Sequence, residues 1–317
     1  MSLTNFPHGI TSMGVPILGA QGIMTGGQAF FVDAANGSDD NTGTDISQPL
    51  KSVRTAYGKT TSGKNDVVYM LPSATADTWT TKLDWSNTYT HLIGLHPGWM
   101  NNRCRIATTT ISKSMTPLLK VSGQGCIIAN VMISQEGENT TYNAVPLEVT
   151  GHRTYFENVH TRNIGAAAYG DISHRSLVIG SCYDVSFKHC QFGETSYDAH
   201  GIACAVIEFN GSNAGKYLFE DCMILGAGST LEVFLKIPAF CGGFWLFKDC
   251  VFLNSVVGNL DAMTQAFSIA NGGNDFVVLK HCIVLGAGAY ETVDSGCLYG
   301  IHAQAAATGE LGVLLTY

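Results

Sequence analysis

A four-residue phrase recurs at an almost constant spacing through the central part of this chain. The copies are Phe156-Glu157-Asn158-Val159, Phe187-Lys188-His189-Cys190, Phe219-Glu220-Asp221-Cys222, Phe247-Lys248-Asp249-Cys250 and Leu279-Lys280-His281-Cys282, preceded by a weaker copy, Ile128-Ala129-Asn130-Val131. The last residues of successive copies are 28, 31, 32, 28 and 32 positions apart. A phrase that returns at this period predicts a solenoid, in which each repeat forms one coil.

The residue types in each phrase indicate which solenoid forms. The first position is large and apolar, the fourth is Val or Cys, and the two between them are charged, amide or imidazole residues. Short strand-like stretches flank the phrase, such as Tyr217-Leu218-Phe219 and Cys222-Met223-Ile224-Leu225, and no helical periodicity falls within the repeat. We therefore predict a strand, a tight two-residue outward corner and a second strand. The fold class is all-β, a single-stranded parallel β-helix.

Stacked coils would place equivalent side chains in rows about 4.8 Å apart. The predicted core ladder consists of Phe156, Phe187, Phe219 and Phe247, beside a ladder of small residues, Cys190, Cys222, Cys250 and Cys282. At the corner, Glu157, Lys188, Glu220 and Lys248 alternate in sign before Lys280 ends the alternation. Opposite charges on neighbouring coils attract weakly and help to fix the register. A second internal copy, Leu225–Gly228 and Leu285–Gly288, is separated by 60 residues, which equals two coils.

Composition limits the partners and the compartment. Of 317 residues, 45% are hydrophobic and 13% are charged, and the net charge is −8 without a basic cluster. We expect no nucleic-acid partner and, because the apolar runs are short, no membrane span. The low charge predicts a surface covered by other subunits, although a surface rich in Ser, Thr and Asn is the alternative.

The ten cysteines are predicted to be free. Four lie in one ladder, Cys182, Cys204, Cys241 and Cys297 lie in other apolar contexts, and no pair has the CxxC spacing of a zinc site. The N-terminus also lacks the charged segment and long apolar stretch of a secretory signal. We therefore expect buried thiols in a chain that folds in a reducing cytoplasm.

Residues 30–57 carry a motif that resembles a known family. Phe30-Phe31-Val32-Asp33 is followed by a polar loop, Asn36 to Thr44, and by Pro49-Leu50-Lys51-Ser52-Val53 and Ala56-Tyr57. This opening resembles that of single-stranded right-handed β-helix proteins of the pectate-lyase-like fold, as do the strand-like segments 67–72 and 91–96. The resemblance implies a first strand, a turn-rich loop and a short helix that caps the open end of the solenoid. Calcium binding by Asp39, Asp40 and Asp45 is an alternative role for the loop, but their spacing is not that of an EF-hand.

We divide the chain into an extended N-terminal arm, residues 1–29, a capped β-helix, residues 30–297, and a C-terminal tail or cap, residues 298–317. The arm is too apolar for a solvated tail. It is interpreted as a segment that docks on a partner, as one that packs along its own β-helix, or as a simple N-terminal cap. The candidate interaction residues are Phe6, Pro7, Ile10, Val15, Pro16, Ile17 and Leu18.

Candidates for chemistry are few in the sequence. An insertion at residues 193–203 contains Glu194, Asp198 and His200, a set able to exchange protons, for which solvated loop side chains are the alternative. Among corner acids, Asp221 and Asp249 lie on adjacent coils, while Glu157 and Glu220 are separated by Lys188. Trp79, Trp85 and Trp99 could stack on a sugar, but we favour packing in the core or at an interface. We assign no catalytic residue, no metal and no cofactor.

Residues 1–19 and 30–44 also resemble the N-termini of structural proteins of tailed bacteriophages that carry this β-helix. These include capsid decoration proteins shaped like small tailspikes, and the resemblance covers residues 1–100. It implies a non-enzymatic virion protein, made in the host cytoplasm, whose homotrimers bind the major capsid protein and stabilise the capsid lattice. The alternative is a tail-associated adhesin or tailspike that binds or depolymerises host-surface glycans. A cellular carbohydrate enzyme of the same fold is a third hypothesis.

Overall fold

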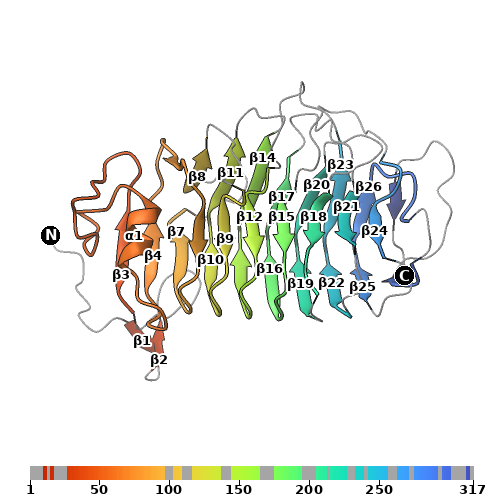
Figure 1. Ribbon diagram of the computed structural model, residues 1–317, viewed down its shortest axis with the longest axis horizontal. Helices are drawn as coiled ribbons and strands as arrows, with labels where there is room; N and C mark the ends of the chain where they lie inside the picture. Colours follow the sequence, from red (N-terminus) through yellow and green to blue (C-terminus); the bar gives the residue numbers. More distant parts are fainter. Residues whose placement is uncertain are drawn as a thin grey trace.

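Three parallel sheets wind around one long axis in the computed structural model (Figure 1). The structure describes residues 10–12, 15–17, 27–96, 103–108, 116–136, 144–164, 175–194, 205–212, 215–226, 233–238, 242–255, 263–270, 275–291, 295–300 and 312–314. From β4 to β26, successive strands enter the three sheets in turn, and they pair in parallel with the equivalent strands of neighbouring coils. The predicted parallel β-helix is confirmed.

We name the sheets B, C and D. Sheet B contains, in order, β3 (Ala29–Val32), β4 (Val67–Met70), β7 (His91–Gly94), β10 (Ile127–Ala129), β13 (Tyr155–Glu157), β16 (Val185–Lys188), β19 (Lys216–Glu220), β22 (Phe244–Lys248), β25 (Phe276–Lys280) and β27 (Leu298–Tyr299). Sheet C contains β5 (Asp77–Thr78), β8 (Arg105–Thr108), β11 (Met132–Glu136), β14 (His160–Ile164), β17 (Gln191–Gly193), β20 (Met223–Gly226), β23 (Val251–Asn254), β26 (Ile283–Leu285) and the antiparallel β28 (Gly312–Leu314). Sheet D contains β6 (Leu83–Trp85), β9 (Leu119–Val121), β12 (Leu147–Val149), β15 (Leu177–Ile179), β18 (Ala205–Phe209), β21 (Val233–Ile237) and β24 (Phe267–Ile269).

The predicted aromatic ladder forms the centre of the core. Phe156, Phe187, Phe219 and Phe247 are fully buried, and their neighbouring ring centroids are 4.8, 4.7 and 4.5 Å apart in stacked geometry. The register pairs Ile128 with Phe156 at one end and Phe247 with Leu279 at the other, so the weaker copies belong to the same row. Each buried Phe contributes roughly 1.5–3 kcal/mol of transfer free energy, which makes this row a large part of the stabilisation.

The cysteine ladder is confirmed as a row of buried free thiols. Cys190, Cys222, Cys250 and Cys282 are all buried, and each thiol donates to the carbonyl of the Phe one coil earlier, at 3.7, 3.5, 3.4 and 3.3 Å. Cys182 and Cys297 are also free and buried, whereas Cys204 and Cys241 lie outside the described residues. The spacing of the second internal copy holds as well, since Leu225, Leu253 and Leu285 pair in register across two coils.

The corner between sheets B and C differs by one residue from the prediction. The second position of each phrase still belongs to the strand of sheet B, and the third and fourth positions make the turn. The third-position residues all have φ between 51° and 56°: Asn130, Asn158, His189, Asp221, Asp249 and His281. Asn, Asp and His tolerate this left-handed conformation better than most residues, which explains why only these types occupy the position.

The charged row along this corner is confirmed in part. Glu220 forms ion pairs with Lys188, at 4.0 Å, and with Lys248. Glu157 instead pairs with His189, at 3.9 Å between Oε1 and Nδ1. The corner residues add links of their own between coils, with His189 3.4 Å from Asp221 and His281 3.2 Å from Asp249.

Helix α1 (Val53–Lys59) covers the open end of the β-helix, as the resemblance of the opening implied (Figure 1). Ser52 is its N-cap and accepts from the Thr55 amide at 3.1 Å, and the helix buries Val53 and Ala56. The loop carboxylate of Asp39 accepts from the amides of Lys51 and Ser52 at 3.0 Å each. In the described part of the chain, no helix has the length and apolar character needed to cross a bilayer.

The N-terminal arm is not simply extended where the structure describes it. Strands β1 (Ile10–Ser12) and β2 (Val15–Ile17) pair antiparallel, with Ile10 opposite Ile17. Two residues separate the strands, the second of them Gly14, and such a short connection between β-branched residues favours a hairpin. Phe6, Pro7 and Leu18 lie outside the described residues. At the other end, β27 extends sheet B past residue 297, so the β-helix continues into the predicted tail.

Candidate functional site

The outer face of sheet D carries a row of charged side chains. In its strands, two inward apolar residues flank one outward residue, because side chains alternate along a strand. The register aligns these outward residues into one row, which consists of Asp84, Lys120, Glu148, Val178, Glu208, Lys236 and Ser268. Charged groups of both signs therefore line one side of the β-helix.

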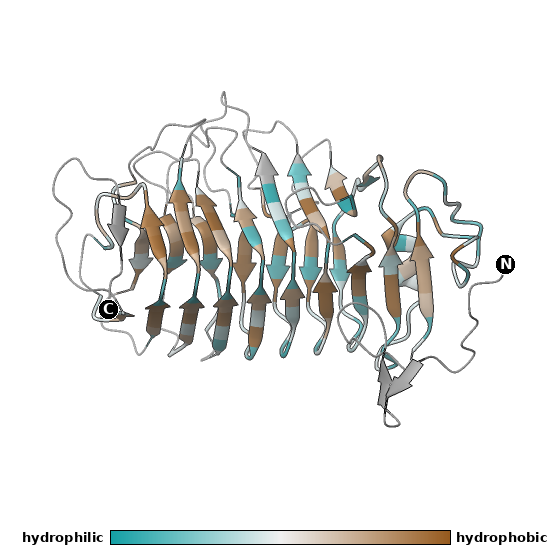
Figure 2. Ribbon diagram, turned by 180° about the vertical axis from the view of Figure 1, so that it is seen from behind, coloured by the Kyte–Doolittle hydropathy of each residue, from teal (hydrophilic) through white to brown (hydrophobic). Residues whose placement is uncertain are grey.

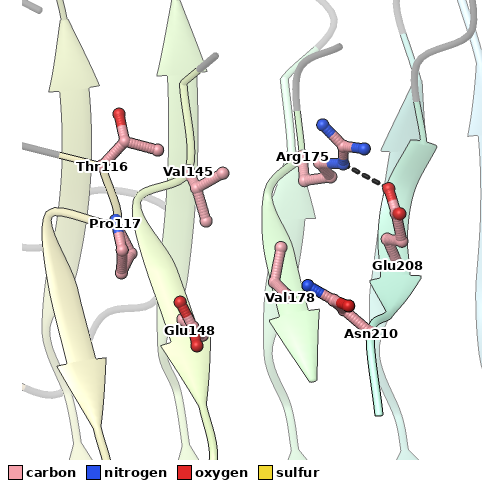
Figure 3. A pocket seen from close by; sticks show the side chains of 8 residues that line it. All are labelled: Thr116, Pro117, Val145, Glu148, Arg175, Val178, Glu208 and Asn210. Carbon is pink, nitrogen blue, oxygen red and sulfur yellow. Dashed lines mark hydrogen bonds and ion pairs between the residues drawn. The ribbon is translucent and has the colours of Figure 1, made fainter. Parts of the chain in front are cut away.

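A hollow of about 320 Å³ opens over the middle of this row (Figure 3). The residues that line it come from strands β9 to β18 and from the segments beside them: Thr116, Pro117, Val145, Glu148, Arg175, Val178, Glu208 and Asn210. Figure 3 shows Glu148 on one side of the hollow, and Arg175, Glu208 and Asn210 on the other. Val145 and Val178 are almost fully buried and form its apolar floor.

Two carboxylates flank the floor of the hollow. Glu148 and Glu208 occupy the same row two coils apart, with Val178 between them, so their strands are separated by roughly 10 Å. Arg175 forms an ion pair with Glu208, and Lys120 lies 3.2 Å from Glu148. Paired carboxylates with cationic and amide groups can bind sugar hydroxyls, and separations of about 6.5–9.5 Å occur in inverting glycoside hydrolases.

Sheet C carries a second polar group, which includes the predicted Glu194. Glu194 lies 3.0 Å from Arg162 in an ion pair. Next to them, His160 is buried, and its Nε2 lies 3.0 Å from Nε2, the side-chain amide nitrogen, of Gln191. Burial lowers the pKa of His160 to about 4 against an opposing effect of Glu194, so the ring is neutral at pH 7. Asp198 and His200, the other members of the predicted set, lie outside the described residues.

The remaining candidates have structural roles where they are described. Asp39 binds the start of α1, and Asp45 accepts from the Ser47 amide at 2.8 Å. Among the described residues, no group of three or more His, Cys, Asp or Glu side chains is placed to hold a metal ion. Trp79 and Trp85 are buried, as the packing interpretation requires, while Trp99 lies outside the described part.

The sequence analysis missed the hollow, although the chain contains a signal for it. The triplets of sheet D form a repeat of their own: Leu119-Lys120-Val121, Leu147-Glu148-Val149, Leu177-Val178-Ile179, Ile207-Glu208-Phe209, Leu235-Lys236-Ile237 and Phe267-Ser268-Ile269. Aligning them would have placed Glu148 and Glu208 in one row. The acids considered in the sequence belong to the phrase at the other corner and to the insertion at residues 193–203.

Comparison with known proteins gives distant likenesses of fold. No protein-family model matches the chain, and neither does any curated protein. Among solved structures, a pectin methylesterase from Aspergillus niger is 13% identical, with a TM-score of 0.49 over 87% of this chain and 91% of that one. The pectate lyase Pel9A is 11% identical, with a TM-score of 0.48 over 81% and 69%. The ORF18 protein of Geobacillus virus E2 is 10% identical, with a TM-score of 0.36 over 82% and 61%. By its own sheets and register, the chain is a parallel β-helix protein with one short capping helix.

Proposed function

We propose that this chain is a non-enzymatic structural protein of a tailed-bacteriophage virion, a homotrimer that binds the major capsid protein and stabilises the capsid. The observation that carries the proposal is the opening of the chain. Residues 1–19 and 30–44 resemble such proteins in sequence, and residues 30–57 form the first strand, the turn-rich loop and the capping helix that the resemblance to β-helix proteins implies. The candidate contacts with the capsid are the residues of the N-terminal arm.

Counting the copies of this chain in purified virions tests the proposal. Quantitative mass spectrometry would compare peptides of this chain with peptides of the major capsid protein. We expect hundreds of copies in a fixed ratio to the capsid lattice. A few copies, or a few tens, would place the chain on the tail and exclude the capsid role.

The hollow on sheet D favours a second candidate function, a tail-associated adhesin or tailspike that binds or cleaves host-surface glycans. Glu148, Glu208 and Arg175 lie around an apolar floor, an arrangement suited to the hydroxyls and the ring face of a sugar. Two properties would be compared between the wild type and the Glu148→Gln and Glu208→Gln variants: binding to purified host polysaccharide, and release of sugars from it. This candidate expects both substitutions to abolish release or to weaken binding, and equal behaviour of all three proteins would exclude it.

A further inference from the structure

Exposed large hydrophobic side chains concentrate on one side of the β-helix. Eight such side chains occur in the described residues, and seven of them lie on sheet B or at its two borders. Phe244, Phe276 and Tyr299 belong to β22, β25 and β27. Tyr89 and Tyr183 occupy the corner that leads into sheet B. Leu95 follows β7 directly, and Ile283 follows the corner after β25, where it begins β26 of sheet C. The eighth, Ile46, belongs to the N-terminal loop.

The outward row through the middle of sheet B is mostly apolar, whereas the outward row at the border with sheet C carries Glu157, Lys188, Glu220 and Lys248. The register places in one row Val67, His91, Ile127, Tyr155, Ser186, Leu218, Leu246, Val278 and Tyr299. These residues alternate with the buried Phe ladder, so their side chains point away from the core. Figure 2 shows the strands of sheet B, along the lower edge of the β-helix, coloured largely hydrophobic.

The exposed area is close to what an interface between subunits needs. The five exposed aromatic rings on and beside sheet B are 38–48% exposed. At about 150–250 Å² per ring, they leave about 320–530 Å² open to solvent. A standard interface takes about 800 Å² from each partner, of which about 450–520 Å² is apolar. Phe276 and Tyr299 also stack, with centroids 5.6 Å apart, so the patch is continuous from one coil to the next.

We propose that the outer face of sheet B is the surface through which three copies of this chain pack around a common axis. The inference rests on the proposed function, which supplies the homotrimer, and it adds the contact surface. Apolar groups that repeat at the spacing of the coils match a partner with the same spacing, and a second copy of this β-helix has it. A three-fold ring needs two different contact areas on each subunit. The two borders of sheet B provide them, one with Tyr89 and Tyr183, the other with Leu95 and Ile283.

The mass of the purified protein in solution, measured by light scattering after gel filtration, tests this surface. The wild type is expected to have the mass of three chains. A double variant, Phe244→Ser with Phe276→Ser, is expected to have the mass of one chain and an unchanged circular dichroism spectrum. Ile46→Ser is the matched control, because Ile46 is at least as exposed as these rings and lies in the loop beside β3, at the opposite end of sheet B; this variant is expected to stay trimeric.

The possible results distinguish a failure of the proposed contact surface from a failure of the proposed function. A folded double variant that stays trimeric would show that the trimer forms through another face. A monomeric wild type would overturn the trimer and its surface together, while the copy number in virions still decides the capsid role. If the double variant does not fold, Phe276→Lys replaces it with the same expectations. Failure of both to fold would mean that these rings pack within their own chain, which overturns the proposal.

Discussion

Sheets B and D have the same kind of interior but different exteriors. The inward residues of both sheets are large and buried, such as Phe219 in sheet B and Phe209 in sheet D. The outward row of sheet D is mostly charged, whereas the middle outward row of sheet B is mostly Val, Ile, Leu and Tyr and lies beside the charged row at the corner with sheet C. A β-helix needs the interior in order to fold, but stacking of the coils does not dictate the outward rows. The difference between the two exteriors therefore carries information about function.

The largest expected loss of stability comes from a substitution in the buried interior, which is of the same kind in both sheets. Phe219→Ala removes a fully buried ring that stacks on Phe187 and Phe247 and leaves a cavity between three coils. We expect the free energy of unfolding in urea to fall by about 3–5 kcal/mol. Leu246→Ala, an outward residue of the same sheet, is the matched control and should cost clearly less. Equal losses would mean that the outer face of sheet B is packed as tightly as the core.

The sequence predicted the interior well because the interior repeats. The Phe and Cys ladders, the register and the capping helix all follow from local patterns that recur in each coil or from one recognisable opening. The corner was misplaced by one residue, since a strand end and a turn residue differ in backbone conformation rather than in polarity. The choice of Asn158, Asp221 and His281 at the third position was the available signal for a left-handed corner.

The candidate site was harder to predict because it depends on distant parts of the chain. Glu148 and Glu208 are 60 residues apart and meet only through the stacking of three coils. Arg175 reaches the hollow from a segment before β15 that has no repeat pattern of its own. Single-sequence reasoning finds such groups only after the register of sheet D is aligned. The apolar outward row of sheet B likewise becomes visible only once inward and outward positions are distinguished.

A second prediction uses pH to examine the outward row of sheet B. His91 belongs to this row, yet it is buried, and its Nδ1 accepts from the Ile127 amide at 3.1 Å. Burial lowers its pKa from 6.5 to about 4. The unfolded chain therefore binds a proton between pH 6.5 and 4 that the folded chain does not, and stability falls as the pH falls through this window.

The size of this effect follows from the pKa difference. We expect His91 to contribute about 3 kcal/mol to the loss of unfolding free energy between pH 7 and pH 4. His91→Asn keeps an acceptor near the ring Nδ1 but does not titrate, so its urea denaturation should depend less on pH. Both proteins must be compared at one protein concentration, because self-association shifts stability. Parallel pH curves for the two proteins would show that the outward face at His91 is open to water.

A third prediction concerns the corner between sheets B and C. Asp221 has a φ of 52°, a conformation that costs alanine roughly 1–2 kcal/mol and glycine nothing. Both Asp221→Ala and Asp221→Gly lose the contact with His189. The difference between their free energies of unfolding therefore measures the cost of the left-handed backbone conformation alone. We expect the free energy of unfolding of the alanine variant to be about 1 kcal/mol lower than that of the glycine variant, and urea denaturation measures the difference. Asp84, an outward residue of sheet D without a positive φ, should show no advantage of glycine over alanine.

The smallest expected effect lies in the charged row of sheet D. Glu148→Gln removes the ion pair with Lys120. The Glu148 side chain is 23% exposed and the Lys120 side chain is 35% exposed. Such pairs contribute about 0.2–1 kcal/mol at low salt and are screened at high salt, so the loss should shrink towards zero at about 1 M NaCl. The urea midpoints of wild type and variant at two salt concentrations measure this difference. A loss of several kcal/mol that persists in high salt would show that the exterior of sheet D is as essential to folding as the Phe ladder. A small, salt-sensitive loss would leave Glu148 available for binding, because the fold itself does not depend on its charge.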